Sequence, residues 1–511
     1  MEEKILDKLE NWAEPLNKEL NLDGTPLWAF YRQMFLTNNF PNRLFNYSVK
    51  NLQKSFKKNE IKNKRVTSYL TRKAIASNEN IKRNIRKNKI KTKSKKAKIL
   101  FYAQADKINN GKIKKMGDIP EEVKKQNIGE IFILSYEPIE KNSGLNLSKQ
   151  DHMIYEYLTK ELLEKTREQA RNLNNKWEKI PEEKKKSLLN IDGKSLYPFI
   201  KEELNFLFSR EFLHTFLIYY NAHKKILKEE NINLVCSIGA GSFYAKTLYA
   251  AANYLKIPTL VTQHGMCFSY IEKDILKNTI FAVFGKKSKE ELIDYGISPK
   301  NIIITGPAIY DDIIKYKKIK PKTDTITLMT SGFYLYGLID SKKYFNYIEK
   351  WLKELNKLNM DIILKLHPEE KESISNYEEI TKRFKRKIKI NIGSTKKELY
   401  TLLGNSSIVI NLGSSVALES IMLEKPVITI MNLHKSAIKD FDMVVNRLLD
   451  SDASINIDKN EDLSKAVLTT IKNKEKLNKK GRKFLSDSVY KIDGNASKRT
   501  ADIIHDLTEI H

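Results

Sequence analysis

From residue 231 onward, short apolar runs of strand-forming residues alternate with helical stretches, and this alternation constrains the fold more than any other feature. NLVCSI (233–238) and TLVT (259–262) are the first two runs, and a stretch with helical apolar spacing separates them. Strands and helices that alternate in this way predict a parallel sheet with helices on both faces. The sequence therefore predicts an α/β fold.

The alternation occurs in two series. The first ends with NIIIT (301–305), and residues 311–324 then contain lysines, one proline and no periodic apolar face, as expected of a linker. The second series contains TITLMTS, DIILKLHP, IKINI, SIVINLGSS and KPVITI. Two series predict two Rossmann-like, doubly wound domains facing a cleft, and ligands of such sheets bind beyond the carboxyl ends of the strands.

The chain has 511 residues, which is too many for one hydrophobic core, and its patterns divide it into four parts. Residues 1–95 are interpreted as a helical, basic extension without strands. Residues 96–315 are predicted to form the first domain, with a helical insertion at about 147–230. Residues 324–490 are predicted to form the second domain, and residues 491–511 a final helix that crosses back to the first.

Lysine and arginine number 91 against 63 acidic residues, a net charge of +28, and the excess is concentrated near the N-terminus. Of the seventeen residues from Lys82 to Lys98, ten are basic and none is acidic. We expect this run to bind an anionic membrane surface, where each basic residue contributes about 1 kcal/mol. A solvated linker is the alternative. No nucleic acid partner is expected, because no basic motif interleaved with aromatic residues appears.

The two cysteines, Cys236 and Cys267, lie in apolar stretches and exclude a disulfide framework or a cysteine-rich zinc site. The N-terminus lacks the apolar core of a signal peptide, and the most apolar helical stretch, near residues 206–220, is too short and polar to span a bilayer. We therefore expect a cytoplasmic protein at the inner face of the cell membrane. Neither a metal nor a cofactor is expected.

His264, in TQHGMCFSY, directly follows a strand, so its imidazole can face the cleft and accept a proton. A histidine that only closes the loop is an equally good interpretation. In LKLHPEE, Pro368 ends a strand, so His367 should point toward the cleft, where it or Lys365 can donate to a phosphate oxygen. A structural His-Pro turn is the alternative there.

In NLGSSVALESIMLEKPV, Gly413, Ser414 and Ser415 stand between a strand and a helix, where free backbone N–H groups can hold an anion. An ordinary serine N-cap would explain one serine but not the run. Glu419 lies one turn further on and can accept from ribose hydroxyls, unless it faces solvent. Thr330 and Ser331, after the first strand of the second domain, form a weaker candidate for a phosphate-facing loop.

Together, IPTLVTQHG, FAVFGKKSKEELIDYGISPKNIIITGPAIYD, KLHP and GSSVALESIMLEKPV, in this order, resemble GT-B-fold transferases that build surface polymers. The families most similar in pattern are the CDP-glycerol glycerophosphotransferases, the capsule polysaccharide transferases, and the sialyl- and polysialyltransferases with His-Pro and Ser-Ser motifs. The resemblance spans about residues 230–435. It implies that His367 and Ser414/Ser415 bind the donor phosphate, that Glu419 holds the ribose and that His264 is a base.

The sequence departs from these families at two points. Gln263 stands where the glycerophosphotransferases usually carry a tryptophan. The acidic pair before a glycine that marks the sialyltransferases has only a weak substitute in Asp106. The donor sugar and its nucleotide (CMP, CDP or UDP) therefore stay open. UDP-N-acetylglucosamine 2-epimerases share the fold but need several carboxylates around the sugar, so they rank second.

The resulting prediction is a metal-independent glycosyltransferase, or alditol-phosphate transferase, of the GT-B type. It would move a unit from a nucleotide-activated donor to a cell-surface glycan or a lipid-linked acceptor. The donor phosphates would lie over residues 413–415 beside His367, which stabilises the leaving group. His264 would take the proton of the acceptor hydroxyl, with Asp106 or Glu137 as the next candidates.

Overall fold

The computed structural model describes residues 20–30, 96–103, 108–109, 112–135, 150–188, 190–191, 194–195, 197–239, 243–265, 272, 275–276, 278–321, 323–335, 338–386, 388–393, 395–433, 448 and 451–509. Most of the predicted N-terminal extension lies outside these residues. So do the greater part of the run from Lys82 to Lys98, as well as Asp106, Glu137 and Cys267.

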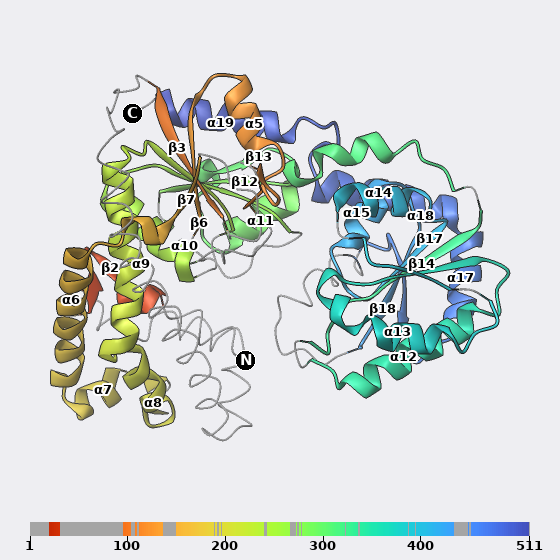
Figure 1. The fold of residues 1–511 in the computed structure, drawn as a ribbon, viewed down its shortest axis with the longest axis horizontal. Helices are drawn as coiled ribbons and strands as arrows, with labels where there is room; N and C mark the ends of the chain where they lie inside the picture. Colours follow the sequence, from red (N-terminus) through yellow and green to blue (C-terminus); the bar gives the residue numbers. More distant parts are fainter. Residues whose placement is uncertain are drawn as a thin grey trace.

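Seven parallel strands form the first sheet, in the order β13-β12-β11-β10-β3-β6-β7 (Figure 1). Strands β3 and β10 lie side by side, and the order in which the chain adds strands reverses between them. The strands are β3 (Ala97–Ala103), β6 (Gly129–Ser135), β7 (Asp151–Met153), β10 (Leu234–Ile238), β11 (Thr259–Thr262), β12 (Thr279–Val283) and β13 (Ile302–Ile304).

Six parallel strands form the second sheet, in the order β16-β15-β14-β17-β18-β19. Its point of reversal lies between β14 and β17, and both sheets add strands in the 3-2-1-4-5-6 order of the Rossmann fold. The prediction of two Rossmann-like domains is confirmed. The strands are β14 (Thr325–Met329), β15 (Asp361–Lys365), β16 (Lys389–Asn391), β17 (Ile408–Asn411), β18 (Val427–Met431) and β19 (Ile455–Asp458).

Each sheet is buried on both faces. In β3, Leu100 and Tyr102 pack into one apolar cluster, whereas Ile99 and Phe101 pack into another on the opposite face. Alternate residues of a strand point to opposite faces, so a strand covered on both sides must be apolar throughout. The covering helices include α5 (Ile119–Lys125), α10 (Phe243–Tyr254), α11 (Lys286–Asp294), α12 (Ser341–Leu355), α13 (Ile374–Thr381), α14 (Lys396–Gly404), α15 (Val416–Met422), α17 (Leu463–Lys472) and α18 (Lys474–Ser488).

A group of helices between β7 and β10 extends away from the first sheet (Figure 1). Residues 20–30 pack on the last of them, where the Tyr220 hydroxyl donates to Asp23 at 2.7 Å and the rings of Phe30 and Phe216 lie 4.7 Å apart. The helices are η4 (Ile154–Tyr157), α6 (Lys160–Lys179), α7 (Glu182–Leu188), α8 (Tyr197–Leu207) and α9 (Arg210–Glu229). Two-stranded hairpins form at β4 (Ile108–Asn109) with β5 (Lys112–Ile113), and at β8 (Asn190–Ile191) with β9 (Lys194–Ser195).

The expectation of no strands before residue 96 is wrong at one place. Strands β1 (Asn21–Leu22) and β2 (Thr25–Pro26) form a hairpin. Asp23 and Gly24, at its turn, have φ of 50° and 84°. An Asp-Gly pair adopts such positive φ values readily, and this pair is the hairpin signal in the sequence.

Three further segments differ from the sequence interpretation. Residues Asp151–Met153, interpreted as the start of a helix, form the edge strand β7, and the helical pattern begins only with η4. Part of the expected linker is the 3-10 helix η6 (Ala308–Tyr316), in which Tyr310 and Ile313 are buried in an apolar cluster with α14 and α15. Strand β19 completes the second sheet and has no counterpart in the sequence interpretation.

Helix α19 (Ala496–Glu509) returns to the first sheet and packs beside α5 (Figure 1). Ala501 and Ile504 are buried against the β3 side of this domain. The Asp311 carboxylate accepts from the backbone N–H of Ala496 at 2.9 Å and of Ser497 at 2.7 Å, so η6 caps the start of the helix. None of the described helices combines the length and apolarity needed to cross a membrane.

Candidate functional site

Three polar loops meet at the carboxyl edge of the second sheet. Strand β14 pairs with β15 on one side and with β17 on the other. The loop after β14 carries Thr330 and Ser331, the turn after β15 carries His367, and the turn after β17 carries residues 413–415. The structure thus brings together residues that lie about 80 positions apart in the chain, at the point where ligands of doubly wound sheets bind.

A buried carboxylate, Glu370, joins two of these loops. It accepts hydrogen bonds from the Thr330 hydroxyl, from the Tyr377 hydroxyl and, at 3.0 Å, from the backbone N–H of His367. The Thr330 Oγ1 also accepts from the same His367 N–H at 2.8 Å. The Thr330 hydroxyl therefore connects the loop after β14 to the turn after β15. Sequence reasoning missed Glu370, although its place three residues after a helix N-cap is the spacing of a capping box.

His367 is the N-cap of the 3-10 helix η7 (Pro368–Ser373), and its Nδ1 accepts from the backbone N–H of Glu369 at 3.4 Å. A ring whose Nδ1 accepts carries its proton on Nε2, so Nε2–H is the donor that can reach a ligand. The side chain is half-buried. Nδ1 thus serves the structural turn, and donation from Nε2–H to a phosphate stays a prediction.

Ser331 and Lys365 are both buried beside these loops. Ser331 lies beside Tyr344, whose hydroxyl accepts from the Ser331 N–H at 3.3 Å. Lys365 Nζ donates to the Leu366 carbonyl at 2.7 Å. Burial lowers the pKa of Lys365, against the opposing effect of Glu398 and Glu370.

The turn at 413–415 has a local hydrogen-bond pattern of its own. Gly413 has a φ of 85°, a conformation that strains other residues. The Ser414 N–H donates to Asn411 Oδ1 at 2.9 Å, and Ser414 Oγ accepts from the Val416 N–H at 3.5 Å. Helix α15 begins directly after this turn, with Ser415 as N-cap and no bond from its side chain to the helix. Ser414 thus serves partly as a cap.

Glu419, in α15, is only 9% exposed, so the solvent-facing alternative does not hold. Burial raises the pKa of Glu419 to about 7, while Lys396 and Tyr400, both on α14, act in the opposite direction. The carboxyl group therefore exchanges a proton near neutral pH. Neither Lys396 nor Tyr400 was singled out in the sequence, because α14 is not adjacent to α15 in the chain.

Lys396 lies where the two domains meet. Its Nζ donates to the carbonyl of Ile309 in η6 at 2.6 Å. Burial lowers the pKa of Lys396, and Glu419, Asp312 and Asp118 raise it. Asp118 belongs to the segment before α5, so the first domain contributes charge to this part of the second.

His264 follows β11 on the first sheet. Gly239, after β10, has a φ of 68°, which favours glycine, and a Cβ there would lie 3.1 Å from His264 Cε1, so the imidazole ring lies against this residue. Although His264 reaches solvent, loss of water around the ring lowers its pKa to about 4, and the positive charge of Lys115 acts in the same direction. The imidazole is neutral at pH 7 and can accept a proton.

Gln263 shows why the loop holds this shape. Its side-chain amide donates to the Gly265 carbonyl at 2.7 Å and to Ser288 Oγ at 3.0 Å, and its oxygen accepts from the Phe284 N–H at 2.7 Å. These bonds join the ends of β11 and β12. Gln263 therefore fixes the backbone beside His264 through its side-chain hydrogen bonds. Across the described residues, no group of three or more His, Cys, Asp or Glu side chains could hold a metal ion.

The model of the UDP-N-acetylglucosamine 2-epimerase family matches residues 279–505. This range is less than half of the chain, yet it contains the whole second sheet and every candidate phosphate- and ribose-binding residue. The candidate bases His264, Asp106 and Glu137 lie outside it. A search of curated proteins found no match.

Two of the solved structures with a similar fold are epimerase or UDP complexes by their descriptions. The UDP-GlcNAc 2-epimerase from Neisseria meningitidis, bound to UDP-GlcNAc, has a TM-score of 0.50 and 13% identity over 81% of this chain and 100% of its own. The S. aureus MnaA structure with UDP has a TM-score of 0.50 and 11% identity over 81% of this chain and 98% of its own. Both comparisons support the GT-B-like arrangement of two domains.

The prediction of a transferase is wrong, because the family model that matches is that of an epimerase, the function ranked second from the sequence. The expected glycan or lipid-linked acceptor is withdrawn with it. The ranking rested on a shortage of carboxylates in the strand-end loops. Glu370 adds a carboxylate beside these loops, and its capping-box spacing after His367 is the sequence signal for it.

Proposed function

We propose that the protein is a sugar-nucleotide enzyme that inverts carbon 2 of UDP-N-acetylglucosamine. The observation that carries the proposal is the epimerase family match, which spans the second sheet and its strand-end loops. The similarity in fold to an epimerase bound to UDP-GlcNAc supports the same ligand class. The nucleotide would lie over the second domain, at the reversal between β14 and β17.

Inversion at carbon 2 requires a base that takes the proton from one face and an acid that returns a proton to the other. Carbon 2 has no neighbouring carbonyl group to acidify it, so proton loss is easier if the UDP group departs from carbon 1 at the same time and leaves a double bond between carbons 1 and 2. Addition of a proton to the other face of carbon 2 and return of UDP to carbon 1 then give the inverted product. Donors at the diphosphate then stabilise the leaving group. We assign this role to His367 Nε2–H, Lys365 and the Ser331, Ser414 and Ser415 hydroxyls. Glu419 is assigned to the ribose, and the neutral His264 to proton transfer.

The test is incubation of the full-length protein with UDP-GlcNAc in D₂O, followed by proton NMR. We expect UDP-N-acetylmannosamine to form with deuterium at carbon 2, since a base that shares its proton with solvent returns deuterium. Addition of EDTA should leave the rate unchanged, because the assigned donors are protein groups. Absence of both conversion and deuterium incorporation would remove the proposal.

We also propose peripheral attachment to the inner membrane face through the run from Lys82 to Lys98, whose ten basic residues carry no acidic neighbour within the run. Co-sedimentation with phosphatidylglycerol vesicles should be lost at high salt, since screening shortens the interaction to about 3 Å at 1 M. A variant in which the lysines of this run are replaced by glutamine should stay in the supernatant. Equal sedimentation of both proteins would contradict the proposal.

A further inference from the structure

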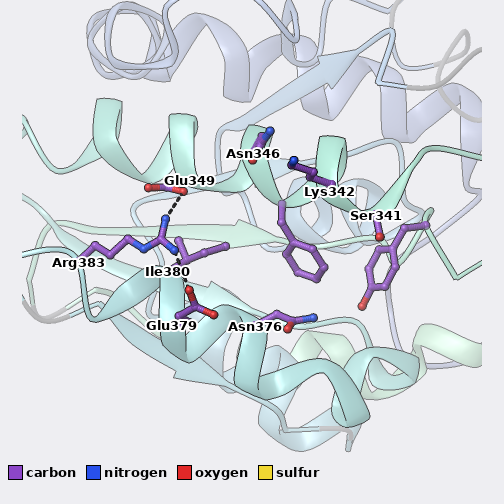
Figure 2. Close-up of a pocket in the computed structure, with 10 residues that line it drawn as sticks. Ser341, Lys342, Asn346, Glu349, Asn376, Glu379, Ile380 and Arg383 are labelled. Atoms are coloured by element: carbon purple, nitrogen blue, oxygen red, sulfur yellow. Dashed lines mark hydrogen bonds and ion pairs between the residues drawn. The ribbon is translucent and has the colours of Figure 1, made fainter.

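A pocket of about 500 Å³ lies between α12 and α13, on the second domain (Figure 2). Its volume is within the range of small-molecule sites. None of the candidate nucleotide residues lines it. The pocket is therefore distinct from the candidate nucleotide residues, and what it binds does not depend on the epimerase proposal.

The charges that line this pocket are balanced. Two cations, Lys342 and Arg383, stand against two carboxylates, Glu349 and Glu379. Arg383 donates to Glu349 Oε2 and to Glu379 Oε1, both at 2.8 Å, and Figure 2 shows these two pairs at one end of the pocket. A phosphate or carboxylate ligand would have to compete with both acceptors for the guanidinium. An uncharged ligand meets no such competition.

The remaining lining combines amides with an aromatic surface. Asn346 comes from α12 and Asn376 from α13, and each amide offers donors and an acceptor (Figure 2). Phe345 also lines the pocket, and its ring packs against those of Tyr334 and Tyr377, with centroids 5.1 and 5.2 Å apart. A purely apolar ligand would leave the amides without partners, which costs affinity.

We propose that this pocket binds an uncharged saccharide of one or two rings. A pyranose offers vicinal hydroxyls, each both donor and acceptor, that match the paired amides and the carboxylate oxygens. Its C–H face can lie on an aromatic ring, which supplies apolar contact in a polar setting. Amides, balanced charge and an aromatic surface together fit this chemistry better than an anion or an apolar molecule.

The pocket adjoins the nucleotide loops through Tyr334, which lines the pocket and follows Ser331 in the loop after β14. The Tyr334 ring packs against Tyr344 at 5.0 Å, and the Tyr344 hydroxyl accepts from the Ser331 N–H at 3.3 Å. A saccharide in the pocket would therefore contact the far end of a loop whose beginning lies in the candidate nucleotide site.

The test uses saturation-transfer NMR on the full-length protein with N-acetylglucosamine, N,N′-diacetylchitobiose and maltose, and with glucose 6-phosphate as the charged comparison. We expect transfer to at least one neutral sugar at about 10 mM, which would fill most of a site with a Kd of about 1 mM. The double variant Asn346→Ala/Asn376→Ala should weaken binding about tenfold or more, as expected for lost hydrogen bonds.

Asn473→Ala, at the end of α17 and outside the pocket, is the matched control and should bind as the wild type does. Both asparagines are exposed, so we expect the double variant to fold, and circular dichroism checks that it does. Absence of transfer to every neutral sugar would overturn the proposal, and so would equal binding by the folded double variant. Stronger binding of glucose 6-phosphate than of the neutral sugars would show an anion site instead.

Discussion

At the scale of single residues, His264 shows how position in the fold sets chemistry. A histidine ring surrounded by water on all sides titrates near pH 6.5 and would be partly charged at pH 7. Loss of water around the ring and the charge of Lys115 both disfavour the imidazolium, so the pKa falls to about 4. The ring is thus a base over the whole physiological range.

His264→Ala should retain UDP affinity but lower the epimerisation rate about 10²–10⁴-fold, because a base acts in the chemical step and not in nucleotide binding. In the wild type the rate should stay constant from pH 8 to pH 5 and fall only as pH approaches about 4. Lys115→Met removes a charge that lowers the pKa, so the fall should move to higher pH. Rates measured across pH, with UDP titrations, check both points.

Circular dichroism at each pH separates loss of rate from loss of fold. This control matters because His223 is fully buried, accepts or donates to Tyr102 at 3.0 Å and Thr247 at 3.1 Å, and has its pKa lowered by burial to about 3. The folded state binds fewer protons than the unfolded chain, so stability declines as pH falls below about 6.5. A wild-type rate that falls near pH 6.5 without unfolding would contradict the lowered pKa of His264, and wild-type turnover in His264→Ala would return the residue to a loop-closing role.

At the scale of elements, the turn after β15 and the loop after β14 form one unit through Glu370. Its carboxylate is fully buried and accepts from both segments and from Tyr377 on α13. A buried acceptor that serves several donors cannot be removed without leaving those donors unsatisfied. The strand-end loops are therefore positioned by a residue that need not touch the ligand.

Glu370→Ala should lower the free energy of unfolding by about 3 kcal/mol or more, because several buried donors lose their acceptor. Glu370→Gln keeps one oxygen acceptor and should lose less. Urea denaturation gives both values, and UDP titration should show weaker binding in each variant, since Thr330 and His367 lose their support. Glu372→Ala, an exposed change on the same helix, is the control and should stay within about 0.5 kcal/mol of wild type. Equal stability of Glu370→Ala and this control would contradict the assignment.

At the scale of the whole molecule, the two domains are joined by η6 and by the return of α19. Lys396 reaches η6 from the second domain, and Asp311 in η6 caps α19 on the first. A nucleotide sugar held over the second sheet should therefore stabilise the entire chain and not one half alone. This expectation follows from linkage, since a ligand that binds only the folded protein stabilises it.

UDP at about 100 times its Kd should raise the stability of the protein by about 2.7 kcal/mol, and CMP, CDP and GDP at the same concentration should raise it less. Thermal unfolding with each nucleotide gives the comparison. His367→Ala and Ser414→Ala should each weaken UDP binding by about 1–3 kcal/mol, the range for a lost hydrogen bond to a charged group. A larger shift with CMP or CDP than with UDP would exclude a UDP-sugar as the substrate.

Local sequence pattern was sufficient to predict both Rossmann-like sheets, except for the edge strands β7 and β19, and the polar clusters at the strand ends. Runs such as LVCSI (234–238) and IVIN (408–411) are apolar because parallel strands are buried on both faces, and this requirement is visible in a few consecutive residues. The clusters are visible for a similar reason, since His264, His367 and Ser414 each stand just after such a run.

Tertiary structure decided which of these clusters meet and what state their side chains adopt. Strand order places β14 between β15 and β17, and no local pattern encodes that neighbourhood. The depressed pKa of His264, the burial of Glu419 against Lys396 and the use of Glu370 as a shared acceptor all depend on residues distant in the chain. Electrostatic environment and hydrogen-bond partnership are properties of neighbours in space, so they exist only once the chain has folded.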